Sequence, residues 1–431
     1  MTKQLHLETI AVHQNYRGDE TNAIVRPIHL TSAYYFNDSD HGASLFDLNT
    51  AGNIYSRLTN PTNDALGTLV SDLEGGAGGL AVATGAAAIT TVILTLCKQG
   101  DHIVASRSLY GGTITLLSGI FTRLGIHTTF VDQSSNIDEL QKSIQKNTKF
   151  VLAEVIDNPL VNVLDFEKFS KLAHDNQIPL VIDSTFTPPT IFKPIEHGAD
   201  IIVHSATKYL GGHGNVMAGI IVDAGKFDWQ ASGKFDNLTQ PDPAYHGLSF
   251  SNSFGNLAFI VKARAQALRD TGLTLSPFNA FLISTGIQTL AIRLAHISQN
   301  TLKIAEWLET HPHIEWVSYP LLKSHPDYQL AKQYFKHGAS GILSFGIKGT
   351  LANSKLFIDS VKLAIQAVNV GDVRTIVTHP ASTTHRQCSD EELKNAGITQ
   401  NLIRLSVGLE NIEDLKADLD QALIRSQALC Q

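Results

Sequence analysis

Five short apolar segments, separated by stretches with helical periodicity, constrain the fold of this chain more than any other feature. Their hydrophobic residues run continuously instead of alternating with polar ones, which is typical of strands covered on both faces. Strands that alternate with helices in this way form α/β domains. The sequence therefore predicts an α/β domain with a mostly parallel sheet, whose strands lie in residues 79–84, 102–106, 150–156, 179–184 and 199–205.

The pattern changes after about residue 250. Long helical stretches are followed there by segments in which apolar and polar residues alternate, an arrangement that indicates a smaller α+β domain. The predicted helices cover residues 256–272 and 289–312, and the predicted strands lie in residues 341–348 and 401–410.

Composition and charge point to small molecules as partners. The formal net charge of −7 gives no basic surface for nucleic acid. The longest nearly apolar run, residues 86–97, is shorter than the ~20 residues that a membrane-spanning helix needs. The three cysteines match neither a disulfide framework nor a metal-ligand spacing, and the N-terminus lacks the apolar core of a signal peptide. We therefore expect a cytoplasmic protein without a metal site.

Polar residues and glycines lie at the carboxyl end of each predicted strand or just after it. In open parallel sheets, ligands bind outside the carboxyl ends of the strands, so these positions are candidates for a binding site. The residues found there are Gly85 and Ala86 at the start of a helix, Tyr110, Asn158, Asp183, and the group Ser205, Thr207 and Lys208.

Together, these residue types describe a site for a planar phosphorylated pyridine. A lysine amine such as that of Lys208 forms a Schiff base with an aldehyde if burial or a nearby positive charge keeps it neutral. Asp183 would hold the pyridine nitrogen protonated, and Tyr110 would stack on the ring. The phosphate would bind backbone N–H groups at a helix start and nearby hydroxyls, here those of Gly85, Ala86, Ser205 and Thr207.

Each of these residues also has a purely structural interpretation. Lysines are usually solvated surface cations, and Tyr110 is equally suited to packing. Asp183 is also suited to capping a helix, and the hydroxyls of Ser205 and Thr207 to bonding nearby backbone groups.

Two glycine-rich segments are similar to nucleotide-binding motifs but stand in the wrong place. The sequence predicts a helix in residues 60–76, with Asn60 as its cap, Pro61 at its first position and glycines at its end. "GAGGLA" at residues 76–81 follows this helix and precedes a strand, which reverses the order of the dinucleotide-binding motif. "GGHGN" at residues 211–215 lacks the Gly-Lys-Ser/Thr ending of an ATP-binding loop. The sequence therefore disfavours a nucleotide enzyme.

Six motifs resemble, in the same order, those of the pyridoxal phosphate enzymes of cysteine and methionine metabolism: "YSRLTNPT", "SLYGGT", "NPLV", "IDSTF", "SATKYLGGHGNVMAG" and "RLSVGLE". The match covers nearly the whole chain. It implies the aspartate aminotransferase-like fold (fold type I). We expect an N-terminal arm in residues 1–60, a pyridoxal phosphate-binding domain in residues 61–265 and a C-terminal domain in residues 266–431.

The resemblance implies a role for each candidate residue. Pyridoxal 5'-phosphate would be the cofactor, with Lys208, Asp183 and Tyr110 as the catalytic residues. Further cofactor contacts would come from Gly85, Ala86, Asn158, Ser205 and Thr207. The phosphate loop departs from the family pattern because it reads "TGAAA", so that Ala86 offers only its backbone.

The resemblance also implies a substrate site and an assembly. Arg404 would bind the substrate α-carboxylate, a task suited to its planar two-point donor geometry, and Asn369 and Tyr55 would also contact the substrate. Tyr55 and Arg57 would reach the phosphate in a neighbouring subunit. The protein is therefore expected to be a homo-oligomer, with a dimer of dimers as the favoured form.

Two further segments are similar to the sulfhydrylase branch of this family: residues 240–250, "QPDPAYHGLSF", and residues 369–385, "NVGDVRTIVTHPASTTH". This resemblance implies that O-acetyl-L-homoserine and sulfide are the substrates and that L-homocysteine and acetate are the products. The alternatives are a cystathionine γ-synthase or γ-lyase with the same cofactor, or a non-catalytic protein that binds pyridoxal phosphate.

Overall fold

The computed structural model of the chain describes residues 5–383, 386 and 397–430 and contains two β-sheets. The larger sheet has seven strands in the order β1-β7-β6-β5-β4-β2-β3. Its strands are β1 (Gly78–Val82), β2 (His102–Ser106), β3 (His127–Val131), β4 (Thr148–Glu154), β5 (Leu180–Asp183), β6 (Ile201–Ser205) and β7 (Gly219–Asp223). The five predicted strands are confirmed as β1, β2, β4, β5 and β6, whereas β3 and β7 were not predicted.

The strand directions bring the carboxyl ends of the predicted strands to one edge of the sheet. Strands β3, β2, β4, β5 and β6 are mutually parallel neighbours. Strand β7 is antiparallel to both β6 and β1, so β1 points in the same direction as β6. The residues that follow β1 and β6 therefore lie at the same edge, as the prediction requires.

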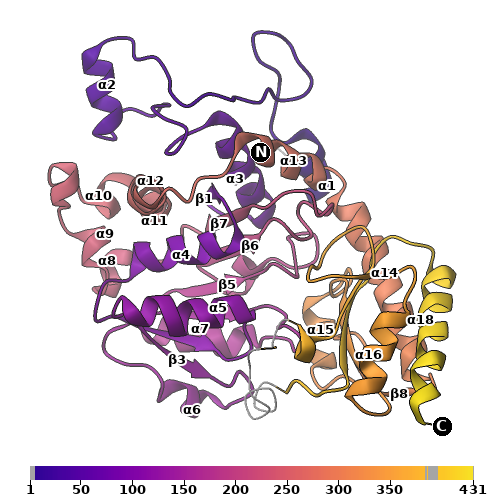
Figure 1. The fold of residues 1–431 in the computed structure, drawn as a ribbon. Coiled ribbons are helices and arrows are strands. Elements are labelled where there is room, and N and C mark those ends of the chain that lie inside the picture. Colours follow the sequence, from indigo (N-terminus) through magenta and orange to yellow (C-terminus); the bar gives the residue numbers. More distant parts are fainter. Residues whose placement is uncertain (1–4, 384–385, 387–396, 431) are drawn as a thin grey trace.

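Helices cover both faces of this sheet, which explains the continuous apolar strands (Figure 1). On one face, α3 (Pro61–Glu74) and α7 (Phe166–Asp175) share a core with Ile182 and Ile202. On the other face, α4 (Gly85–Leu96) shares a second core with Val181 and Val203. Further helical segments of this region include α5 (Gly111–Thr115), a π-helical turn (Leu116–Phe121), α6 (Ile137–Gln141), α8 (Trp229–Ser232) and α9 (Asp236–Thr239).

Helix α3 begins and ends as the sequence predicts. The Asn60 side chain accepts hydrogen bonds from the N–H groups of Thr62 and Asn63, and Pro61 occupies the first turn. Gly75 ends the helix in the left-handed conformation, with φ of 80°, which glycine adopts without steric cost. These local signals fix the point at which the chain enters the large sheet.

The predicted helix at residues 256–272 is an α-helix interrupted by a π-helical turn. It consists of α11 (Ala258–Lys262), the turn Ala263–Leu268 and α12 (Arg269–Thr271), after α10 (Phe250–Phe254). Its apolar residues belong to the same core as α4. The domain boundary predicted after residue 265 falls within this helical stretch. We propose that the chain divides into an N-terminal arm, a cofactor-binding domain and a C-terminal domain, with the boundary between the two domains in this stretch.

The smaller sheet has five strands in the order β10-β11-β12-β9-β8 and confirms the expected second α+β region. Its strands are β8 (Ile314–Ser318), β9 (Ile342–Ile347), β10 (Ile365–Gln366), β11 (Ile376–Thr378) and β12 (Leu402–Ser406). The helices of this region are α13 (Pro277–Ile287), α14 (Leu290–Glu309), α15 (Tyr328–Tyr334), α16 (Leu351–Ser360) and α18 (Ile412–Ser426). In Figure 1, the second region lies beside the carboxyl edge of the large sheet.

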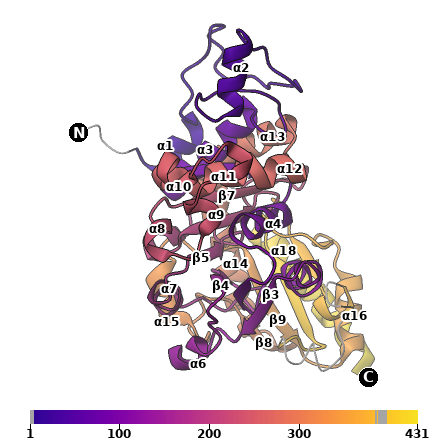
Figure 2. The same cartoon turned by 90° about the vertical axis from the view of Figure 1, so that its left-hand side faces the viewer.

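The N-terminal segment extends away from the rest of the chain, as Figures 1 and 2 show. It contains α1 (Leu7–His13), which lies near α3, and α2 (Ser39–Phe46) at the far end. Ile24 and Tyr35 are 96% and 100% exposed. Such exposed large apolar side chains are typical of a surface that another molecule covers.

Within the part of the chain that the structure describes, no single helix is both long and apolar enough to cross a membrane. Helices α13 and α14 are long and apolar enough only when they are taken together, and the chain bends by 62° between them.

Candidate active site

Lys208 lies in the connection between β6 and β7 and contacts the second region of the chain. Its Nζ donates a hydrogen bond of 2.6 Å to Oδ1 of Asn369, which lies between β10 and β11. Burial, together with the positive charge of Arg404, lowers the pKa of Lys208 to about 8. Both influences disfavour the charged amine, which is the condition that Schiff-base formation requires.

Arg404 on β12 is buried and contacts the loop of Asn369 and the loop that follows β4. Its Nη1 donates to Oδ1 of Asn158 at 3.0 Å, and its Nη2 donates to the carbonyl oxygen of Asn369 at 3.4 Å. Burial lowers its pKa to about 10, so the side chain is still a cation at neutral pH. A guanidinium has five N–H donors, and these two contacts leave donors for a substrate carboxylate.

Asp183 ends β5 and is held by the turn that follows it. The Thr185 N–H donates to Oδ1 of Asp183 at 2.9 Å, while Thr185 Oγ1 accepts from the Ser205 N–H at 2.8 Å. Burial raises the pKa of Asp183. A cation beside this carboxylate would reverse that shift, which is what a protonated pyridine nitrogen supplies. Thr185 was missed as a site residue, although it lies within the "IDSTF" motif.

The start of α4 lies directly against Ser205. The Thr84 side chain accepts from the Ala87 N–H at 3.0 Å and caps the helix. A Cβ on Gly85 would lie 2.7 Å from Cβ of Ser205, so only glycine fits here. The first N–H groups of a helix have no acceptor within the helix, and those of Gly85 and Ala86 therefore suit a phosphate group.

The hydroxyl of Thr207 has a structural role. Thr207 Oγ1 donates to the Ala218 carbonyl oxygen at 3.2 Å and accepts from the Ala218 N–H at 3.1 Å. These contacts match the structural interpretation of this residue.

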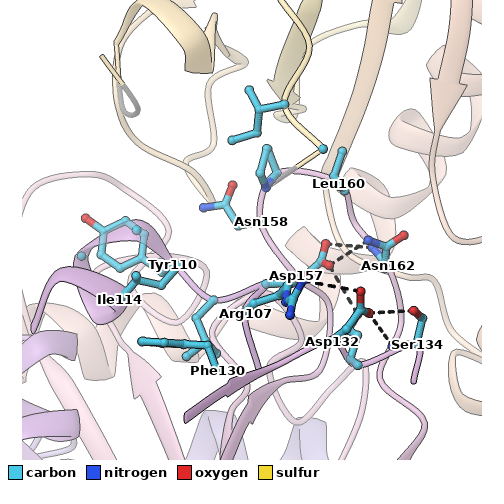
Figure 3. Close-up of a pocket in the computed structure, with 18 of the residues that line it drawn as sticks. Arg107, Tyr110, Ile114, Phe130, Asp132, Ser134, Asp157, Asn158, Leu160 and Asn162 are labelled. Carbon is cyan, nitrogen blue, oxygen red and sulfur yellow. Dashed lines mark hydrogen bonds and ion pairs between the residues drawn. The ribbon is translucent and has the colours of Figure 1, made fainter. Parts of the chain in front are cut away.

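Tyr110 lies at the wall of a large cavity that Figure 3 shows. The cavity has a volume of about 1600 Å³, and Ala86, Tyr110 and Asn158 are among the residues that line it. A Cβ on Gly112 would lie 2.5 Å from the Tyr110 ring, so the ring lies across this glycine. Tyr110 is 54% exposed, which leaves one face of its ring free to stack on a ligand.

Glu154 is a second residue that sequence reasoning missed. It ends β4 and is the register partner of Asp183 on β5. Its Oε1 accepts a hydrogen bond of 2.6 Å from the Tyr110 N–H. The residue precedes the "NPLV" motif by only a few positions, but the sequence contains no signal that pairs it with a tyrosine 44 residues earlier.

Tyr55 and Arg57 lie apart from this group. Arg57 Nη1 donates to the carbonyl oxygen of Arg269 at 2.5 Å, and its guanidinium carbon is 5.5 Å from the centre of the Tyr55 ring. Tyr55 is 45% exposed. Among the described residues, neither has a hydrogen bond to Lys208, Asp183 or Ser205.

The segment at residues 240–250 is anchored to the helix that follows it. Asp242 accepts from Lys262 Nζ at 2.9 Å and from Gln266 Nε2 at 2.8 Å. Tyr245 Oη donates to the Ala265 carbonyl oxygen at 2.7 Å. Residues 384–385 of the second branch-like segment lie outside the described residues.

These residues fit pyridoxal phosphate by the chemistry of their donor set. A lysine whose pKa is lowered, a partly buried carboxylate, an exposed aromatic face and a glycine-bounded helix start match the aldehyde, ring nitrogen, ring and phosphate of that group. Fold and site together thus define a pyridoxal phosphate enzyme with the aspartate aminotransferase-like fold.

Comparisons with known proteins identify the family. The model of the Cys/Met metabolism PLP-dependent enzyme family matches residues 8–424. The chain belongs to this family, so pyridoxal phosphate is its cofactor. The resemblance found in the sequence is confirmed.

Individual relatives match along nearly their full length. The chain is 47% identical to an O-acetyl-L-homoserine sulfhydrylase of Leptospira meyeri, with 98% of each chain covered. It is 45% identical to a homocysteine synthase of Schizosaccharomyces pombe, with 97% of this chain and 98% of the relative covered. A solved structure of a putative O-acetylhomoserine (thiol)-lyase from Campylobacter jejuni, which contains N'-pyridoxyl-lysine-5'-monophosphate, has a TM-score of 0.95 and 40% identity over 97% of this chain and 100% of that chain.

Proposed function

We propose that this protein replaces the acetate group of O-acetyl-L-homoserine with sulfide, which yields L-homocysteine and acetate for methionine biosynthesis. The observation that carries this proposal is the similarity, over nearly the whole chain, to relatives named for this reaction. The arrangement of Lys208 and Arg404 supports it, because the reaction needs a proton carrier beside a carboxylate-binding cation. We place the reaction in the cytoplasm, in keeping with the absence of a disulfide pattern among the cysteines.

Each site residue has a proposed task. Arg404 binds the substrate α-carboxylate, while Asn158 and Asn369 hold its guanidinium in place. Lys208 moves protons at Cα and Cβ of the substrate, for which an amine with a pKa of about 8 is suited near neutral pH. The backbone of Gly85 and Ala86, together with Ser205 and Thr207, binds the phosphate, with Thr207 acting mainly through its support of the loop.

Bound pyridoxal phosphate supplies an electron-withdrawing ring that stabilises negative charge on the substrate carbons. Asp183 keeps the ring nitrogen protonated, and Tyr110 covers one face of the ring. During the reaction the Cγ–O bond to acetate breaks and a Cγ–S bond to sulfide forms.

A competition assay tests the substrate assignment. We expect homocysteine as the main product when the holoenzyme receives O-acetyl-L-homoserine with equal concentrations of sulfide and cysteine. Products are separated and quantified by mass spectrometry, with O-succinyl-L-homoserine as the matched ester control. If cystathionine dominates, or if only the succinyl ester reacts, the sulfhydrylase assignment is wrong while the family assignment stands.

We further propose that the protein works as a homo-oligomer whose smallest competent unit is a two-fold dimer, and that two such dimers form a tetramer. The extended N-terminal segment supports this, because its exposed apolar residues need a cover. Among the described residues, neither Tyr55 nor Arg57 has a hydrogen bond to another proposed site residue. A second copy of the chain would receive these two side chains at its phosphate site.

Mixing two inactive variants tests the shared site. Lys208→Ala and Arg57→Ala are refolded together, and a mixed dimer then has one site with native Lys208 from one chain and native Arg57 from the other. Random pairing should restore about a quarter of the wild-type activity, because half of the dimers are mixed and each has one intact site. Each variant refolded alone is the control. If verified mixed dimers stay inactive, Arg57 serves its own subunit and the shared site is refuted.

A further inference from the structure

Glu154 is a buried carboxylate for which the proposed chemistry has no task. It is 7% exposed and ends β4 beside Asp183, its register partner on β5. Asp157, three residues later along the chain, is also buried, with 1% exposure. Among the described residues, no ion pair involves Glu154. Three carboxylates therefore lie close together at this edge of the sheet, of which Glu154 and Asp157 are buried and Asp183 is partly buried.

Neighbouring buried carboxylates are not all ionised, because each charge raises the cost of the next. Burial, together with the negative charges of Asp183 and Asp157, raises the pKa of Glu154 well above its usual value, and the N–H of Tyr110 opposes this only in part. A pyridine cation beside Asp183 favours the ionised form of the Asp183 side chain. Glu154 is then the neighbour that remains protonated.

The hydrogen bond from Tyr110 gives this neutral carboxyl group a function. The Tyr110 N–H donates to Oε1 of Glu154 at 2.6 Å, at the residue that immediately precedes α5. The Tyr110 ring lies across Gly112, so the backbone position of Tyr110 determines where the ring lies in the cavity. The carbonyl oxygen of an uncharged Glu154 carboxyl group accepts this hydrogen bond as well, so no negative charge is needed.

We propose that Glu154 is a positioning residue that holds Tyr110 over the cofactor ring as an uncharged hydrogen-bond acceptor, which leaves Asp183 as the ionised carboxylate of the pair. This inference rests on the proposed cofactor site. It predicts that the length of the Glu154 side chain matters and that its charge does not.

Two substitutions separate length from charge. Glu154→Gln keeps the length and an acceptor oxygen but has no charge, whereas Glu154→Asp keeps the carboxylate but withdraws the acceptor by one methylene group. The measurements are the dissociation constant of pyridoxal phosphate and the visible circular dichroism of the purified holoenzyme, which reports on the asymmetric surroundings of the bound ring. Neither depends on which nucleophile the enzyme uses, so a failed product assay would leave both readouts unaffected.

We expect Glu154→Gln to retain the wild-type dichroism, with a dissociation constant within about twofold of wild type. Glu154→Asp should change the dichroism and weaken cofactor binding by about tenfold, which corresponds to the loss of one hydrogen bond. A defective Gln variant would show that the charge is needed and would overturn the inference, whether or not the Asp variant is also defective. Wild-type behaviour of both variants would equally overturn it, because Tyr110 would then not depend on this contact.

Discussion

Replacing Lys208 with alanine should abolish the reaction and the covalent attachment of pyridoxal phosphate. The side chain amine is both the proposed bonding partner of the aldehyde and the proposed proton carrier, so one substitution removes two functions. Acid–base catalysis alone contributes ~10²- to 10⁴-fold, and we expect kcat/KM to fall by at least about a thousandfold. The hydrogen bond between Lys208 and Asn369 is lost as well, but this contact alone does not explain so large a decrease.

Borohydride reduction followed by mass spectrometry of the intact chain measures the attachment. Wild-type protein should gain the mass of one pyridoxyl group, and Lys208→Ala should gain none. Lys171→Ala is a suitable control, because this lysine on α7 is largely exposed and forms an ion pair with Asp175 on the same helix. If the variant still gains the pyridoxyl mass after reduction, the cofactor is attached to a different lysine.

Asp183→Asn should bind pyridoxal phosphate but lose most of its catalytic activity. Asparagine preserves the shape of the side chain and can still accept the hydrogen bond from the Thr185 N–H. It has no negative charge to keep the ring nitrogen protonated. Removal of one electrostatic contact in an active site typically costs ~10²- to 10³-fold in kcat, and we expect a decrease of this size.

Cofactor content from the visible absorbance and kcat from steady-state kinetics separate the two effects. Asp223→Asn provides a matched control, because Asp223 likewise ends a strand of the large sheet. Asp223 is buried and ends the antiparallel strand β7, at the opposite edge of the sheet. Its Oδ1 accepts a hydrogen bond from the Gly225 N–H, which an asparagine side chain at this position can also accept. A variant of Asp183 that loses both cofactor and folding stability would show that its role is structural.

Much of the large sheet could be predicted from local sequence patterns. Continuous apolar segments identified five strands, and Asn60, Pro61 and Gly75 marked the limits of α3. Strand β7 was missed, although "GIIVD" is apolar, because the strands were predicted from apolar segments separated by helical stretches. An antiparallel strand needs no such crossover, and β7 returns directly from the loop that contains Lys208.

The candidate site was predictable as a list of residues but not as a set of contacts. Asp183 stood out because it lies at the end of a predicted strand, and Lys208 because it comes just after one. The partnership of Lys208 with Asn369 spans 161 residues and that of Arg404 with Asn158 spans 246. Before the structure, only resemblance to a family pointed to Arg404 and Asn369.

The sequence by itself determined the elements, because apolar periodicity and helix caps act between residues that are neighbours in the chain. The tertiary structure alone decided which side chains meet and in which protonation state. Glu154 and Thr185 acquired their partners only when separate segments came together, and the lowered pKa of Lys208 results from burial and from a cation on β12. Burial and electrostatic proximity are properties of the assembled fold, since they depend on distances in space that sequence separation does not contain.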